Sequence, residues 1–257
     1  MKPLLCSALA FLTLSLPAQW PLAVPIPKEP HHHLVLENDY VRVFRVNLPA
    51  HEATLLHQHD VPYFYVALGP ADVINAVAGK PEAHLVMADG QVGYSRGGFA
   101  HIARTDSGLV FNNVTIELLH PQGQLRNICE KIIDGPLNDC PSPEFGRLPP
   151  DSPLKALPGA MRMKRVFETD GILVTSFSVA LEEKYAESGS RPAQLLVVEE
   201  NSELRVDVPG QSPRALHGGE VLWLEAGKEW TIVTAGAQRA TRFLLFRFKD
   251  ARAAKTP

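Results

Sequence analysis

Three histidines carry the strongest chemical signal in the chain. His57 and His59 stand one residue apart in "LLHQHD", and His101 follows in "RGGFAH". Alternate side chains of a β-strand point to the same face, so a strand would aim His57 and His59 into one pocket. A neighbouring strand could add His101. Neutral imidazole is the commonest side-chain ligand of zinc, iron, copper and nickel, so the pattern predicts a metal site.

The residues around these histidines have the pattern of short β-strands that are separated by turns and glycines. The segment "VLENDYVRVFRVNLPAHEATLLHQHD" begins with an alternating strand and a turn, and Gly69 ends the next apolar run in "VALGP". Further on, "DGQVGYSRGGFAHIART" contains Gly90, Gly98 and His101 in the order glycine, short strand, glycine, histidine. The stretch 35–120 therefore resembles the two sequence motifs of the cupin superfamily.

This resemblance implies an all-β fold of the double-stranded β-helix (cupin or jelly-roll) type, with His57, His59 and His101 as metal ligands. The ion would be one divalent transition metal among Fe, Mn, Ni, Cu and Zn. The implied partner is a small-molecule ligand or substrate held inside the barrel. A subset of cupin dioxygenases has such three-histidine sites, with open positions for water, substrate or oxygen.

The sequence departs from the family pattern at several positions. Cupins usually have a glutamate a few residues after the histidine pair, where this chain reads "PYFY". Tyr63 and Asp60 are the candidate substitutes. Tyr63 could point inward, whereas Asp60 follows His59 directly and should point to the opposite face. Arg96 stands where proline is usual, and Thr105 where asparagine is usual.

Other polar residues are candidates for the pocket or its surroundings. Arg96, if it faces inward, would favour an acidic substrate, because arginine pairs bidentately with carboxylates. His84 shares a face with Glu82 if their strand is regular, and either could support a metal ligand or lie exposed. We place His51 at the barrel rim. The tract 31–33 could bind metal, but we expect a solvated, flexible N-terminal arm.

The second half of the chain repeats the first. The segment "VLENDYVRVFRVNL" from Val35 aligns without a gap with "VFETDGILVTSFSV" from Val166, and "GGEVLWLEAGKEWTIVTAG" has the shape of the second cupin motif. Internal repetition predicts two barrels in tandem. We assign an N-terminal metal-binding barrel to residues 23–120 and a degenerate C-terminal barrel to residues 161–250.

The C-terminal barrel has lost the ligand positions. Carrying the alignment forward puts Ser188 and Ser190 in place of the histidine pair, and Trp230 in place of His101. Hydroxyls are weak ligands for these metals and indole is none. We expect Trp223 and Trp230 to fill a core, which leaves one metal site per chain.

Residues 121–160 are rich in proline, which fixes φ and removes a backbone donor, so they form a linker or strap rather than strands. This linker contains Cys129 and Cys140, the two cysteines that remain if Cys6 is removed with the N-terminus. In an oxidising compartment they would form a disulfide that stabilises the fold by about 2–3 kcal/mol.

The N-terminus has the pattern of a secretory signal peptide. Lys2 precedes the apolar run "PLLCSALAFLTLSLPA", which is too short for a good membrane span. We expect cleavage near Ala18 and exclude residues 1–22 from the fold. The mature protein would then be periplasmic or secreted, with no membrane association.

Composition and net charge limit the classes of molecule that the protein is expected to bind. The chain has 257 residues, 45% of them hydrophobic and 21% charged, as in an ordinary globular protein with room for two domains. A net charge of −3 gives no electrostatic case for nucleic acid or an anionic membrane. A homodimer through barrel edges is the candidate self-association.

Two functions of different classes fit these observations. The first is a dioxygenase-like enzyme that uses its metal on a small organic substrate. The second is a non-enzymatic cupin that binds a metal or a small ligand, for example as a sensor. A zinc-dependent isomerase or hydrolase is a third, weaker candidate.

Overall fold

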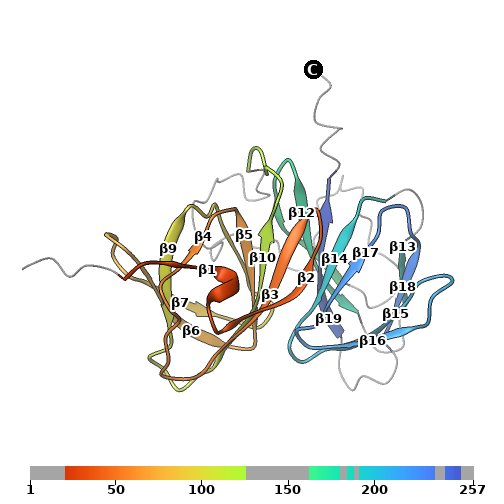
Figure 1. Cartoon of the computed structure of the whole chain (residues 1–257). Helices are drawn as coiled ribbons and strands as arrows, with labels where there is room; N and C mark the ends of the chain where they lie inside the picture. Colours follow the sequence, from red (N-terminus) through yellow and green to blue (C-terminus); the bar gives the residue numbers. More distant parts are fainter. Residues whose placement is uncertain (1–20, 126–161, 180–183, 188–190, 235–240, 250–257) are drawn as a thin grey trace, which may run out of the picture.

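The computed structural model describes residues 21–125, 162–179, 184–187, 191–234 and 241–249. Figure 1 shows these residues as two β-sandwich units side by side, the first coloured orange to green and the second teal to blue. The predicted all-β class with two cupin barrels in tandem is confirmed, and each barrel consists of two facing sheets. Among the described residues, no helix is long and apolar enough to span a bilayer. The predicted signal peptide and the Cys129–Cys140 disulfide lie outside these residues.

The first barrel contains two five-stranded sheets, with strand orders β1-β4-β9-β6-β7 and β2-β3-β10-β5-β8. Its elements are β1 (Val24–Pro25), the 3-10 helix η1 (Ile26–Lys28), β2 (His32–Glu37), β3 (Val41–Leu48), β4 (His57–His59), β5 (Tyr63–Leu68), β6 (Ala71–Val77), β7 (Ala83–Met87), β8 (Val92–Ser95), β9 (Phe99–Arg104) and β10 (Phe111–Leu118).

The second barrel repeats this arrangement, with sheet orders β11-β12-β19-β14-β17 and β13-β18-β15-β16. Its strands are β11 (Arg162–Glu168), β12 (Ile172–Val179), β13 (Lys184–Glu187), β14 (Gln194–Val198), β15 (Glu203–Asp207), β16 (Arg214–His217), β17 (Val221–Leu224), β18 (Trp230–Val233) and β19 (Thr241–Phe248). Each strand of the second barrel thus has a counterpart in the first.

The repeat extends to irregular features of the backbone. The β2–β3 ladder shifts register between Leu34 and Leu36, and the β11–β12 ladder shifts between Arg165 and Phe167. The turns after β2 and β11 are also the same. The side-chain oxygen of Asn38 accepts hydrogen bonds from two backbone N–H groups in the first barrel, and that of Thr169 does so in the second. The sequence alignment predicts both equivalences, so the duplication is structural as well as sequential.

The two barrels are joined by a shared apolar layer. Aliphatic and aromatic side chains on the outer faces of β5 and β10 pack against those of β14 and β19 in one buried cluster. Phe64, which is fully buried, lies with its ring centroid 5.1 Å from that of Phe167 and 5.3 Å from that of Phe246. Strand β14 is buried on both faces, since one face lies in this layer and the other in the second barrel. Its sequence "QLLVV" is therefore apolar at nearly every position.

The opposite faces of these strands line the two barrel interiors, which differ in chemistry. In the first barrel a small apolar cluster that includes Leu48, Val73 and Phe111 fills one part, and polar side chains occupy the rest. The interior of the second barrel is filled by a larger apolar cluster that includes Phe177, Leu245 and Trp230. Only the first interior, within the described residues, has the donors for a metal.

Candidate metal centre

Strands β4 and β9 bring the three predicted histidines together. They pair antiparallel with His57 directly opposite His101, and the ring centroids of these two residues lie 4.4 Å apart. His59, two residues along β4, has its ring centroid 5.2 Å from each of the other two. All three side chains are buried inside the barrel. The alternation that predicts a shared face for His57 and His59 therefore holds.

Fixed hydrogen-bond partners orient two of these rings. Nδ1 of His57 donates to the backbone oxygen of Leu55 at 2.9 Å, and Nδ1 of His101 lies 2.5 Å from Oδ1 of Asn75. When Nδ1 of a neutral ring donates its proton to an acceptor, Nε2 carries no proton and its electron pair is free to bind a metal. Nε2 of His101 and Nδ1 of His59 are buried and make no hydrogen bond within the described residues. Such orphaned nitrogens are expected where an ion is to be bound.

Burial keeps these histidines neutral. Desolvation, with a smaller contribution from the neighbouring histidines, lowers the pKa of His57 to about 4 and that of His101 to about 3. The pKa of His59 is also well below its ordinary value, mainly through burial and then through His101 and His57. Metal ions bind the neutral ring, so the cluster is in its ligating form at neutral pH.

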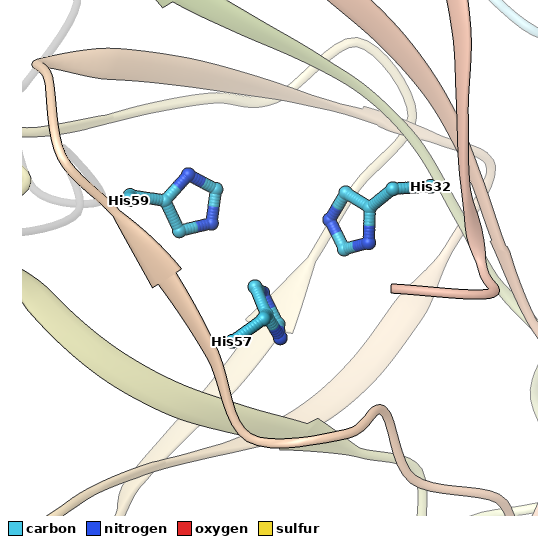
Figure 2. Close-up of side chains that lie close together, drawn as sticks. All are labelled: His32, His57 and His59. Atoms are coloured by element: carbon cyan, nitrogen blue, oxygen red, sulfur yellow. The ribbon is translucent and has the colours of Figure 1, made fainter. Parts of the chain in front are cut away.

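A fourth histidine, His32, joins the cluster, and the prediction of a flexible arm is wrong for this residue. The tract lies at the start of strand β2, where His32 is buried and His33 is exposed. The ligand atoms of His32, His57 and His59 lie within 4.8 Å of one another, and Figure 2 shows the three rings turned toward a common space. The run "LVLE" after the tract indicates a strand, and consecutive strand residues point to opposite faces, so His32 and His33 cannot share one face.

Glu29, which no sequence motif marks, supports the N-terminal histidines. Its buried carboxylate lies 2.6 Å from Nδ1 of His32 and 2.9 Å from Nδ1 of His31. Burial raises the pKa of Glu29, but these two hydrogen bonds, with smaller electrostatic and backbone contributions from His32 and Leu55, outweigh burial and hold the pKa at about 2. The carboxylate is therefore ionised at every pH at which the protein is expected to work.

Tyr63 occupies the stretch of the missing family glutamate, and its ring stacks on the imidazole of His59. The two centroids are 3.8 Å apart with an interplanar angle of 16°. Burial raises the pKa of Tyr63 to about 12, with a hydrogen bond to Ser95 opposing the rise. The phenol is thus neutral and lies against the face of His59. Asp60, the other candidate substitute, is exposed and accepts a hydrogen bond from Gln58.

A buried carboxylate lies on the strand next to Tyr63. Glu117, on β10, is paired across the ladder with Tyr63, and its Oε1 is 3.7 Å from Nδ1 of His59. Its Oε2 is 2.8 Å from a guanidinium nitrogen of Arg42. Burial raises the pKa of Glu117 to about 7, and Arg42 opposes that rise. No motif marks this residue, because only the β5–β10 pairing brings it to the histidines.

The other predicted site residues lie apart from the histidine cluster. His84 is exposed on β7 and pairs with Asp72, while Glu82 forms a two-point ion pair with Arg104. His51 is exposed in a turn with φ of 63°. Arg96 is exposed beside a cavity of about 560 Å³ next to the linker, lined by Pro62, Tyr94, Arg96, Gln122, Gly123, Gln124 and Leu125.

Cross-strand register shows how the second barrel lost its polar interior. By their pairing, Phe243 and Leu245 of β19 stand where β10 has Asn113 and Thr115. Trp230 is buried in the apolar core, as predicted, and its ring centroid is 5.6 Å from that of Tyr185. Trp223 packs against the layer between the barrels. Ser188 and Ser190 lie outside the described residues.

Comparison with known proteins identifies the fold. The sequence matches no known family model and no curated protein. Solved structures do match: a salicylate 1,2-dioxygenase from Pseudaminobacter salicylatoxidans has 12% identity and a TM-score of 0.57, covering 84% of this chain and 75% of its own. The protein Ylba from E. coli has 8% identity and a TM-score of 0.58, covering 89% and 87%.

A third match is a cupin 2 conserved barrel domain protein from Leptotrichia buccalis, with 12% identity, a TM-score of 0.50 and coverage of 85% and 88%. The class of protein is therefore clear: the chain has the cupin fold. More particularly, the chain has two barrels of this fold: the first contains a buried cluster of histidines, and the second, over its described residues, has an apolar interior.

Proposed function

We propose that the first barrel binds one divalent first-row transition metal ion through His57, His59 and His101. The observation that carries this proposal is the set of buried, neutral imidazoles that face one another, with Nε2 of His101 and Nδ1 of His59 making no hydrogen bond to the part of the chain that the structure describes. Leaving such groups unpaired is costly unless a ligand satisfies them. Imidazole donors suit iron, nickel, copper and zinc better than magnesium or calcium.

The chemistry that we propose is dioxygenase-like, on a small organic substrate. A bound ion with three protein ligands would polarise and orient a substrate at its open positions. The chain itself supplies tautomer control through Asn75 and the Leu55 carbonyl, and apolar side chains such as Phe111 that exclude water from the barrel. One structural neighbour is a salicylate 1,2-dioxygenase solved with gentisate, which supports aromatic hydroxy acids as first substrates to test.

Metal analysis of the purified protein tests the site. We expect about one ion per chain, and loss of that ion in His57→Ala and His101→Ala variants, because each removes a ligand. His84→Ala is the matched control, since this histidine is exposed and pairs with Asp72. A protein that binds no transition metal, or variants that keep the wild-type metal content, would contradict the proposal.

A non-enzymatic binding or sensing role is the second candidate. Tyr63 stacked on His59 in the region of the family glutamate favours it, because no acidic ligand follows the histidine pair. Oxygen consumption by the metal-loaded protein with gentisate, salicylate, a flavonol and a thiol separates the two functions. Turnover that is abolished in His57→Ala supports the enzyme, and substrate binding without oxygen uptake supports the binding protein.

We also propose that the protein is exported and that Cys129 and Cys140 form a disulfide. The apolar segment after Lys2 and the two remaining cysteines support this proposal. N-terminal sequencing of protein from the periplasmic and culture-medium fractions should find a start near residue 19. Thiol titration of the denatured, unreduced mature protein should find no free thiol. An uncleaved cytoplasmic protein with free cysteines would contradict both.

A further inference from the structure

An N-terminal strap crosses the seam between the two sheets of the first barrel. The strap comprises β1, η1 and β2, and β1 pairs in parallel with β4 at Val24 and His57. β2 pairs with β3 of the other sheet, where His32 faces Val46. In Figure 1 this red-to-orange segment passes over the barrel with η1 between its two strands. The strap is thus anchored at both ends, directly beside the histidine pair.

The strap brings His32 into the barrel. This side chain is buried, and its ring centroid lies 4.8 Å from that of His57 and 6.2 Å from that of His59. Phe44 closes one side at 6.2 Å, edge to face. Figure 2 shows His32 approaching from the side opposite to the strand that bears His57 and His59. His32 therefore faces the same space as the pair while belonging to the other sheet.

Glu29 determines the orientation of His32. One carboxylate oxygen lies 2.6 Å from Nδ1 of His32 and accepts from the backbone N–H of His31 at 2.9 Å. The other oxygen accepts from the backbone N–H of Leu55 at 3.2 Å, which ties the strap to the residues just before β4. A carboxylate on Nδ1 is the usual second partner of a metal-bound histidine, because it fixes the tautomer and raises the basicity of the ligand.

We propose that His32 is a fourth protein ligand of the metal ion and that Glu29 is its positioning residue. This inference rests on the proposed function, since it concerns the same ion. An imidazole from the strap would then take the place of the carboxylate ligand that is missing after the histidine pair. Binding of the ion would then join the N-terminal strap to β4 and β9, so that the metal stabilises the strap against local opening.

Binding of Co²⁺ and Cu²⁺ to the full mature chain tests this inference. The variants are His32→Ala, His32→Gln and Glu29→Gln, and the matched control is His33→Ala, the adjacent, exposed histidine. We expect His32→Ala and His32→Gln to lower Co²⁺ affinity at least tenfold, and Glu29→Gln to lower it about tenfold. The Co²⁺ visible spectrum and the nitrogen hyperfine splitting of bound Cu²⁺ should change in the His32 variants alone.

Circular dichroism of the metal-free variants confirms that each is folded, and His32→Gln provides a polar side chain if the alanine variant is not. Wild-type affinity and spectra in both folded His32 variants, alongside loss of binding in His57→Ala, would overturn this inference and leave the proposed function intact. A wild-type protein that binds neither ion would overturn the proposed function itself.

Discussion

His57 and His101 stand directly opposite each other on antiparallel strands β4 and β9, with ring centroids 4.4 Å apart. The candidate metal centre depends on this single cross-strand pair. A register slip of one residue would turn His101 to the outer face of the sheet and disperse the cluster. The hydrogen bond to Asn75 on β6 holds the ring of His101 in place on the far side of β9.

Asn75→Ala should weaken metal binding although Asn75 is not a proposed ligand. The variant removes the acceptor at Nδ1 of His101, so the ring can rotate or exchange its tautomer. We expect about a 10- to 100-fold loss of Co²⁺ affinity, measured by titration. Asn75→Asp keeps an acceptor and should restore most of the affinity. Equal loss in both variants would show that Asn75 acts through packing instead.

Tyr63→Phe should leave the metal content unchanged, whereas Tyr63→Ala should reduce it. The ring of Tyr63 stacks on His59, and its hydroxyl bonds to Ser95. Phenylalanine keeps the stack, and alanine leaves a cavity beside a ligand ring. The metal content of the purified variants, measured per chain, tests both expectations. If Tyr63→Phe abolishes binding as Tyr63→Ala does, then the hydroxyl has taken the place of the family glutamate as a ligand.

Phe64→Ala should destabilise both barrels together by about 3–5 kcal/mol. Phe64 is fully buried in the layer between the barrels, against Phe167 and Phe246. Urea unfolding followed by tryptophan fluorescence and by circular dichroism measures the loss. Val86→Ala, at a side chain that is 69% exposed, is the control and should change stability by no more than about 0.5 kcal/mol. A small effect of Phe64→Ala would mean that the barrels fold independently of this contact.

Glu199→Gln should change how stability depends on pH. Burial raises the pKa of Glu199 to about 7, while Arg242, at 3.1 Å, opposes the rise. The folded wild-type protein therefore takes up a proton more readily than the unfolded chain, so its stability falls as pH rises from about 4.5 to 7. Glutamine removes this dependence, and the stability difference, variant minus wild type, should become more positive across that interval and be constant above it.

The expected change in that difference is on the order of 1–3 kcal/mol, because one unit of displaced pKa corresponds to about 1.4 kcal/mol. Denaturant unfolding of both proteins from pH 4.5 to 8.5 measures it. Glu225→Gln, an exposed glutamate of the same barrel, is the control and should give a flat difference. A flat difference for Glu199→Gln as well would show that its carboxyl titrates as it does in the unfolded chain.

The sequence by itself determined the features that depend on local alternation and on repetition. A strand places His57 and His59 on one face whatever its neighbours are, because alternate side chains share a face. The ungapped match between Val35 and Val166 implied the second barrel, and the recurrence of the shifted ladder at both positions confirms that match. The burial of Trp230 was likewise predictable, because the alignment places its apolar indole at the inward-facing position of His101.

Only the tertiary structure decided which distant residues complete the cluster. Glu29, Asn75 and Glu117 carry no motif, and His32 belongs to a tract expected to be a flexible arm; each reaches the histidines through strand pairing or through the strap. The sequence does not show whether a polar residue on a strand faces solvent or the interior of a barrel. The fold encloses His32, whose ring packs beside that of His57 from the other sheet, and leaves the adjacent His33 exposed to solvent.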